Sequence, residues 1–452
     1  MVLRSVRPID FLDATVMPVT APARPLDPAE RFFWMLDRLS TMNFLVLAEL
    51  AGHVEPATLK AALNRVQACH PMARVRIDRS AAGDLEFVPD VTPIPLAVQV
   101  TTAREDALAA TLAWRFQPNE APLIRALWLP AEGGGWLALT FHHAIADGRS
   151  AMAFLQEVLA AAAGEQVETT HPLHPPLHAL YPPQWQAEAR GEAAQSVRQA
   201  RKAALKRHGR PETLPAHRPS ANPAHPALAR ILLSAPTTSA LQRYARAAGT
   251  TVHGLIGAAQ LLALCQTFGD DAAHVLSLTS PVDLRASLVE PVSQATPGFY
   301  VSLLTTNAHV MPGADLKDLA RTLSDDIRLQ RERGDGHLLY EMMAPLIALP
   351  ATDAGLAAFG EAVLATPPSS LVSNVGVIEG PALLEGLTVE RLSFALCPMP
   401  YQPLFTAVST WRGEMTLNLN WDAARLESSA ALKVREAMAH HLHTLSASAI
   451  EA

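Results

Sequence analysis

The stretch LALTFHHAIADGRSAMAFL, residues 137–155, ends an apolar run with two adjacent histidines and then supplies an acid and a glycine. The preceding residues read as a hairpin, because the strand-like runs LIRALWLP and GWLALTF are separated by the turn residues AEGGG. After Gly148, apolar residues recur at helical spacing as far as Gly164, a typical helix end. The pattern predicts a strand, a short loop that carries the histidines, and a helix.

The two histidines have separate environments in this prediction. His142 and His143 lie at a strand end, where successive side chains point to opposite faces. Loops between strands and helices often present catalytic groups, and histidine suits proton transfer near neutral pH. One ring is therefore a candidate general base, held in one tautomer by carbonyls of a loop that Gly148 allows to bend. A metal site formed by both rings and Asp147 is disfavoured by their divergence, and ordinary hydrogen-bonded core histidines are the other alternative.

Length and composition indicate a large, soluble, mixed protein. The 452 residues favour two domains, and 49% hydrophobic with 17% charged residues allows a substantial core. A formal net charge of −7 gives no general reason to expect nucleic acid as a partner. The three cysteines have no metal-ligand spacing, so we expect neither disulfides nor a metal site, and a reducing cytoplasm fits. We also expect no secretory signal, no membrane span and a monomer.

Proline-rich segments divide the chain. Helix-like and strand-like patterns alternate on both sides of a region with prolines at each end and a basic helical stretch between them. We therefore predict an N-terminal unit over residues 1–175, a crossover over 176–226 and a C-terminal unit over 227–452.

HHAIADG matches the HHxxxDG signature of a large acyltransferase superfamily, and further matches follow in the family's order. ACHPMARVRI resembles its early segment, in which a helix ends at His-Pro and leads into a strand. SPVDLRASL and PGFYVSLLT resemble an Arg-bearing and a Gly-Phe strand, SSLVSNVGVI a Ser-Asn strand, and the segment from EMTLNLNW onward the final strand and helix. The chain resembles chloramphenicol acetyltransferase, nonribosomal peptide condensation domains, wax ester synthases and polyketide-associated acyltransferases. The Asp-Phe-Gly-Trp-Gly signature of the plant branch has no counterpart.

The resemblance implies an α/β (α+β) fold of two chloramphenicol acetyltransferase-like domains, each a mixed sheet flanked by helices, with an active-site tunnel between them. It implies that His143 is the general base that deprotonates the acceptor, that His142 supports it, and that Asp147 forms a structural ion pair with Arg285. A triad in which Asp147 orients His143 is the alternative. The Gly148 N–H is a candidate oxyanion donor.

Further candidate residues are less specific. Ser373 and Asn374, in the Ser-Asn strand, are either substrate or oxyanion contacts or ordinary strand-end hydrogen-bonding groups. A basic stripe with a spacing of four residues is either a solvated helix face or a binding site for an anionic donor. The stripe consists of Arg198, Lys202, Lys206 and Arg210.

The expected reaction is transfer of an acyl or polyketide chain from a thioester to an acceptor hydroxyl. The donor is a phosphopantetheine thioester on an acyl or peptidyl carrier protein or an acyl-coenzyme A, with no permanently bound cofactor, and the acceptor is a small-molecule alcohol or amine. One alternative is a stand-alone condensation enzyme that forms an amide or ester. Another is a non-catalytic module that binds carrier proteins or acyl chains.

Overall fold

The computed structural model describes residues 23–167, 170, 171, 173, 175–212, 214–215, 224–294, 296–366, 369–399, 402 and 404–451. Residues 1–22, on which the expectation of no secretory signal rests, lie outside this part, as does most of the second proline-rich segment. Among the described residues no single helix is long and apolar enough to cross a bilayer. The one helix pair that meets the criteria jointly, Ala235–Ala247 with Val252–Phe268, is bent by 98°.

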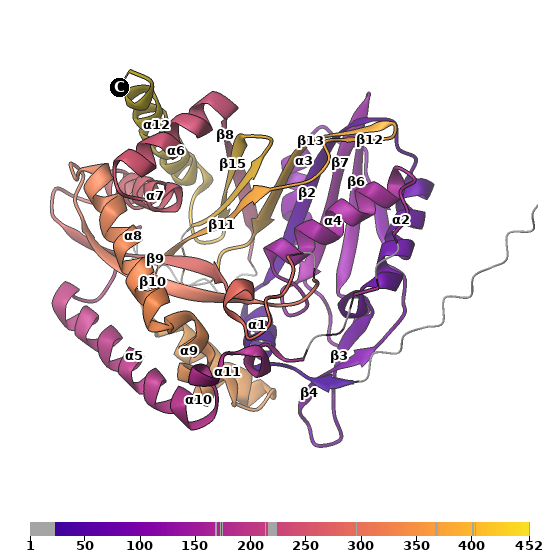
Figure 1. Cartoon of the computed structure of the whole chain (residues 1–452), viewed down its shortest axis with the longest axis horizontal. Coiled ribbons are helices and arrows are strands. Elements are labelled where there is room, and N and C mark those ends of the chain that lie inside the picture. The colour runs from indigo at the N-terminus through magenta and orange to yellow at the C-terminus, as the bar shows by residue number, and fades with distance from the viewer. Residues whose placement is uncertain are drawn as a thin grey trace, which may run out of the picture.

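Two six-stranded mixed sheets form the frame, and Figure 1 shows them side by side with helices on their outer faces. The first sheet has the strand order β12 (Leu383–Leu384), β13 (Leu387–Leu396), β2 (Asn43–Gly52), β7 (Gly134–His142), β6 (Ile124–Ala131) and β5 (Leu96–Val98). The second has the order β10 (Val301–Val310), β9 (His274–Asp283), β11 (Ser370–Ile378), β14 (Phe405–Trp411), β15 (Glu414–Asp422) and β8 (Pro226–Leu233). A small sheet joins β1 (Arg24–Pro25), β4 (Leu85–Pro89) and β3 (Val75–Arg79).

The helices divide between the two halves. Those of the first half are α1 (Pro28–Leu39), α2 (Pro56–Cys69), α3 (Arg104–Ala113) and α4 (Gly148–Ala162), and α5 (Ala187–His208) lies in the crossover. The second half carries α6 (Ala235–Ala247), α7 (Val252–Phe268), α8 (Leu316–Arg333), α9 (Asp335–Met342), α10 (Ala344–Ile347), α11 (Asp353–Leu364) and α12 (Ser428–Glu451). The predicted fold class, mixed sheets flanked by helices, is therefore confirmed.

Local sequence signals explain the elements that frame the loop at residues 143–147. The predicted hairpin is formed by β6 and β7, which pair antiparallel, and Gly133 takes a left-handed φ of 73° in its turn. Asp147 caps α4 by accepting from the N–H groups of Arg149 and Ser150. β7 is buried over its last six residues and fixes where the loop begins.

The sequence analysis did not foresee an exchange between the halves. β12 and β13 belong to the C-terminal half of the chain, yet β13 pairs antiparallel with β2 of the first sheet. Figure 1 shows this orange segment beside the indigo and purple strands. Side-chain bonds from the second sheet reach it, since Asn418 Nδ2 donates to the Phe394 carbonyl and Trp411 Nε1 to that of Val389. The division of the chain at residues 176–226 stays a prediction. β12 and β13 follow this division in the sequence but join the sheet that is built from strands before it.

Candidate active site

The two histidines at the end of β7 lie in different surroundings. His142 is buried, and its Nδ1 accepts from the Ala144 N–H at 3.1 Å. Nε2 must therefore carry the proton of the neutral ring, and it lies 3.8 Å from Oδ2 of the fully buried Asp37. Burial lowers the pKa of His142 to about 4. This ring serves the packing between β7 and α1.

His143 faces an apolar cavity. Its Nδ1 lies 3.0 Å from the Ala146 carbonyl, which can only accept, so Nδ1 carries the proton and Nε2 the lone pair. Among the described residues Nε2 has no hydrogen-bond partner. Phe33, Phe44 and Phe299 surround the ring with centroid separations of 4.5, 4.7 and 5.5 Å. Burial lowers the pKa of His143 to about 4, so the ring is neutral at neutral pH and able to accept a proton.

Asp147 lies at the centre of a buried network. Arg285 Nη2 approaches its Oδ2 at 2.9 Å and its Oδ1 at 3.0 Å. Oδ2 also accepts from the Tyr300 N–H at 3.0 Å, and Oδ1 from the capped end of α4. Arg285 in addition donates to Asp283 and Ser150, and the ion pairs raise its pKa although burial opposes them. The carboxylate therefore holds the loop and the second half together, and among the described residues its hydrogen-bond partners do not include His143.

Gly148 begins α4 and lines the same cavity as His143. A side chain here would place Cβ 3.2 Å from Val375 Cγ1, so the glycine permits close approach of β11. The Asp147 carboxylate caps the next two N–H groups of the helix, and among the described residues the Gly148 N–H has no acceptor. It is thus a donor at the positive end of the helix dipole.

The second sheet contributes the opposite wall. Ser373 and Asn374 lie on β11 and both line the cavity. Asn374 Oδ1 accepts from the N–H of Gly376, within a bulge of the pairing with β14, which leaves its Nδ2 donors for other contacts. The cavity has a volume of about 90 Å³, so it is narrower than the roughly 300–1,000 Å³ sites that bury a whole drug-sized ligand. Its apolar lining comes from Met42, Phe44, Leu303, Leu371, Phe394, Leu396, Met399 and Phe405.

The basic stripe is only partly as predicted. Arg198, Lys202 and Lys206 are exposed on α5, but that helix ends at His208. Gly209 has a φ of 89°, so Arg210 lies beyond the helix and is not part of its face. The prediction of one four-residue spacing missed this glycine. None of the four residues lines the cavity at His143, and Figure 1 shows α5 along the outer edge of the second sheet.

Sequence reasoning missed other residues at the site. Arg149 and Asp283 line the cavity and form an ion pair at 3.4 Å. Arg149 follows the signature directly and Asp283 lies two residues before Arg285, so both were within reach of the motif. Phe33 carried no such signal, because an aromatic residue on an amphipathic helix usually belongs to the core, and only the folded chain brings it to His143.

The class of protein follows from the fold, the loop and the sequence relationships together. Residues 222–419 match the family described as phthiocerol/phthiodiolone dimycocerosyl transferase C-terminus. A phthiocerol/phthiodiolone dimycocerosyl transferase of Mycobacterium sp. (strain JLS) is 27% identical over 337 residues, which are 70% of this chain and 75% of the relative. Together these matches support a place in the condensation-domain and chloramphenicol acetyltransferase-like acyltransferase superfamily, and the named relatives indicate an acyltransferase.

Solved structures share the whole fold. Polyketide synthase associated protein 5 from Mycobacterium tuberculosis aligns with a TM-score of 0.66 and 19% identity over 94% of this chain and 100% of that one. The trichothecene 15-O-acetyltransferase from Fusarium sporotrichioides aligns with a TM-score of 0.70 and 14% identity over 94% of this chain and 95% of that one. The relatives are consistent with a donor bound to coenzyme A or to a carrier protein.

Proposed function

We propose that this acyltransferase moves an acyl chain from a thioester to an acceptor hydroxyl, with His143 as the general base. The observation that supports this most directly is the neutral His143 ring, whose Nδ1 is engaged by Ala146 while Nε2 has no described partner. An acceptor hydroxyl that donates to Nε2 becomes a stronger nucleophile as its proton is transferred.

The reaction then runs without a covalent enzyme intermediate. The acceptor oxygen forms a bond to the thioester carbonyl carbon while its proton passes to His143 Nε2. The carbonyl oxygen becomes an oxyanion, which the Gly148 N–H stabilises, with Ser373 and Asn374 on the opposite wall as further donors. Collapse breaks the carbon–sulfur bond, releases the thiol with the proton from His143, and leaves the ester. His142 and the Asp147–Arg285 pair act by holding the loop.

The shape and chemistry of the cavity favour an apolar substrate chain. Its lining is dominated by methionine, leucine and phenylalanine side chains. It adjoins a second, wider pocket that shares Arg149, Pro281, Asp283 and Asn374 with it and extends to the start of α7 and the side of α8. We propose that the phosphopantetheine arm of the donor enters through this pocket, so that its thioester lies near His143.

The decisive experiment follows acyl transfer by intact-protein mass spectrometry. Acylated carrier proteins and acyl-coenzyme A are incubated with the enzyme and a panel of alcohols and amines. We expect loss of the acyl group from the donor and appearance of an ester, and a reduction of at least about 100-fold for His143→Ala. His440→Gln, on the far α12, is the matched control. Full transfer by a folded His143→Ala protein would exclude the general-base role, and products formed only with amines would favour the condensation alternative.

A carrier protein is the proposed macromolecular partner. Its acidic surface would match the exposed cations Arg198, Lys202 and Lys206 on α5. Reversing Lys202 and Lys206 to glutamate should raise the KM for a carrier-bound donor and leave the KM for the coenzyme A donor unchanged. If the variant and the parent have the same KM for the carrier-bound donor, the basic residues of α5 only contact solvent.

A further inference from the structure

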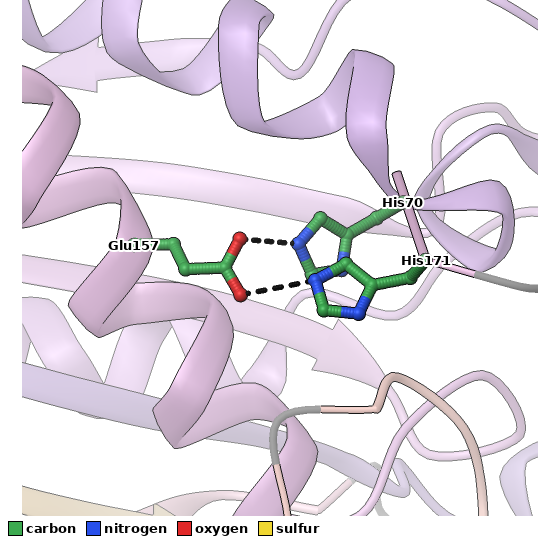
Figure 2. Close-up of side chains that lie close together, drawn as sticks. All are labelled: His70, Glu157 and His171. Atoms are coloured by element: carbon green, nitrogen blue, oxygen red, sulfur yellow. Dashed lines mark hydrogen bonds and ion pairs between the residues drawn. The ribbon is translucent and has the colours of Figure 1, made fainter. Parts of the chain in front are cut away.

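A cluster of two histidines and one glutamate lies beside α4, away from the cavity. Glu157 lies on that helix, His70 follows the last residue of α2, and His171 belongs to the segment that leads into the crossover. Figure 2 shows both imidazole rings directed at the one carboxylate. None of the three lines the cavity at His143.

The three ligand atoms converge closely. His70 Nε2 lies 2.7 Å from Glu157 Oε2, and His171 Nε2 lies 3.2 Å from Oε1. The two rings are 4.2 Å apart between centroids, and one ligand atom from each of the three residues lies within 4.8 Å of the others. Among the described residues this is the one group of three or more metal-ligating side chains that meet so closely.

We propose that His70, Glu157 and His171 form a binding site for a divalent transition-metal ion of the zinc class. Two imidazole nitrogens and a carboxylate oxygen are a donor set that zinc accepts, and a water can complete a tetrahedron. Tetrahedral bonds of about 2.0–2.2 Å separate ligand atoms by about 3.4 Å. With Oε2 as the ligand oxygen, its 2.7 Å separation from His70 Nε2 therefore needs to open by less than about 1 Å. This site differs from the expectation of no metal that the cysteine spacing and the divergent His142 and His143 suggested.

The surroundings give the ion a path and the ligands a suitable protonation state. Glu157 is 24% exposed at its side chain while His70 is 1% exposed, so the site opens on the side of the carboxylate. Burial favours neutral His70 and lowers its pKa, although the carboxylate opposes this. Burial also works to raise the pKa of Glu157, but hydrogen bonds from the two imidazoles hold that pKa at about 2. A neutral imidazole, as for His70, and an ionised carboxylate, as for Glu157, are the forms that bind metal.

The tautomer of His70 is not fixed against metal binding. Its second ring nitrogen, Nδ1, is buried and has no hydrogen-bond partner among the described residues. The ring proton can therefore move from Nε2 to Nδ1 and expose the Nε2 lone pair to the ion. The bound ion would tie α2, α4 and the start of the crossover together, where at present the His171 N–H bonds to the Cys69 carbonyl at 2.9 Å.

The test uses the full chain, first freed of metal by dialysis against a chelator. Zn²⁺ is titrated by isothermal calorimetry in a non-chelating buffer, and the metal retained after gel filtration is counted by mass spectrometry. We expect one equivalent per chain, and a weakening of at least tenfold in both Glu157→Gln and His171→Gln. Co²⁺ should give the visible absorption of a tetrahedral complex in the parent protein and lose it in the variants.

Two control variants separate this site from adventitious binding. His53 and Glu55 form an exposed pair at 2.7 Å, so His53→Gln should bind the metal as the parent does. Cys69→Ser removes the thiol next to His70 and should also leave the affinity unchanged. Two results would show that the three residues only hydrogen-bond to one another: absence of saturable Zn²⁺ binding, or the same affinity in folded Glu157→Gln and His171→Gln as in the parent protein. Because acyl transfer by the chelated protein is measured separately, failure of this proposal leaves the assigned reaction untouched.

Discussion

Helix α4 carries two carboxylates that are held in different ways. Asp147 caps its first turn and pairs with the guanidinium of Arg285, a group that stays charged at every ordinary pH. Glu157, almost three turns further along, is held by two imidazoles whose protons can leave. The first arrangement suits a loop that must hold His143 in one position. The second arrangement can exchange its imidazole protons for another ligand. We call the Asp147–Arg285 pair the fixed anchor of α4, and Glu157 with its two histidines the replaceable anchor.

Breaking the fixed anchor should have the largest effect. Arg285→Met leaves the Asp147 carboxylate buried without its cation, which we expect to cost about 3–5 kcal/mol of the free energy of unfolding. Urea denaturation followed by circular dichroism measures it. Adding Asp147→Asn to Arg285→Met should recover part of the loss, because the double variant buries no unpaired charge. A loss below about 1 kcal/mol for Arg285→Met would contradict a structural role for the pair.

The pH dependence of acyl transfer tests whether His143, on the loop that Asp147 holds, acts as a neutral general base. A general base must be neutral, and burial lowers the pKa of His143 to about 4. We therefore expect kcat/KM to be level from neutral pH down to about 5 and to fall as pH drops through about 4, approaching tenfold per pH unit. Circular dichroism at each pH checks that the fold persists. An acid limb near the ordinary histidine pKa of about 6.5 would show that the ring is solvated during the reaction.

Weakening the replaceable anchor should have a moderate effect on stability alone. Glu157→Gln keeps the shape of the side chain but replaces a carboxylate by an amide with one acceptor oxygen, so one of the two imidazole bonds is lost. We expect a loss of about 1–3 kcal/mol in the free energy of unfolding. Acyl transfer should stay at the parent rate, because Glu157 does not line the cavity. A large loss of activity in folded Glu157→Gln would mean that both ends of α4 serve the reaction.

The smallest expected effect is at the first residue of the helix. Gly148→Ala keeps the N–H and places its new Cβ 3.2 Å from Val375 Cγ1, which must move by a few tenths of an ångström. Alanine has the better helix propensity, so we expect the free energy of unfolding to change by less than about 1 kcal/mol. Acyl transfer should fall only as far as the loop shifts. Val375→Ala in the same protein should restore the lost rate, and a rate that stays low would place the defect elsewhere.

Much of the local structure followed from short sequence signals. The hairpin turn at Gly133 and the end of β7 at His142 were accessible, because backbone sterics and strand alternation act over a few residues. The end of α5 also has a local signal, because Gly209 is a typical helix cap. The regular spacing of the basic residues predicted a longer helix instead. The exchange of β13 into the first sheet had no local signal, since an apolar strand fits equally well beside many partners.

The sequence by itself determined the chemical class of this protein: a strand, the loop HHAIADG, a helix and the Arg-bearing segment mark an acyltransferase, because backbone rules and residue chemistry operate locally. Only the tertiary structure decided which ring faces the cavity, which aromatic residues enclose it, and that His70, Glu157 and His171 meet. These depend on contacts between residues such as Phe33 and Phe299, whose separation in the chain is large. Such contacts form when two sheets pack around a shared core, and no short pattern encodes them.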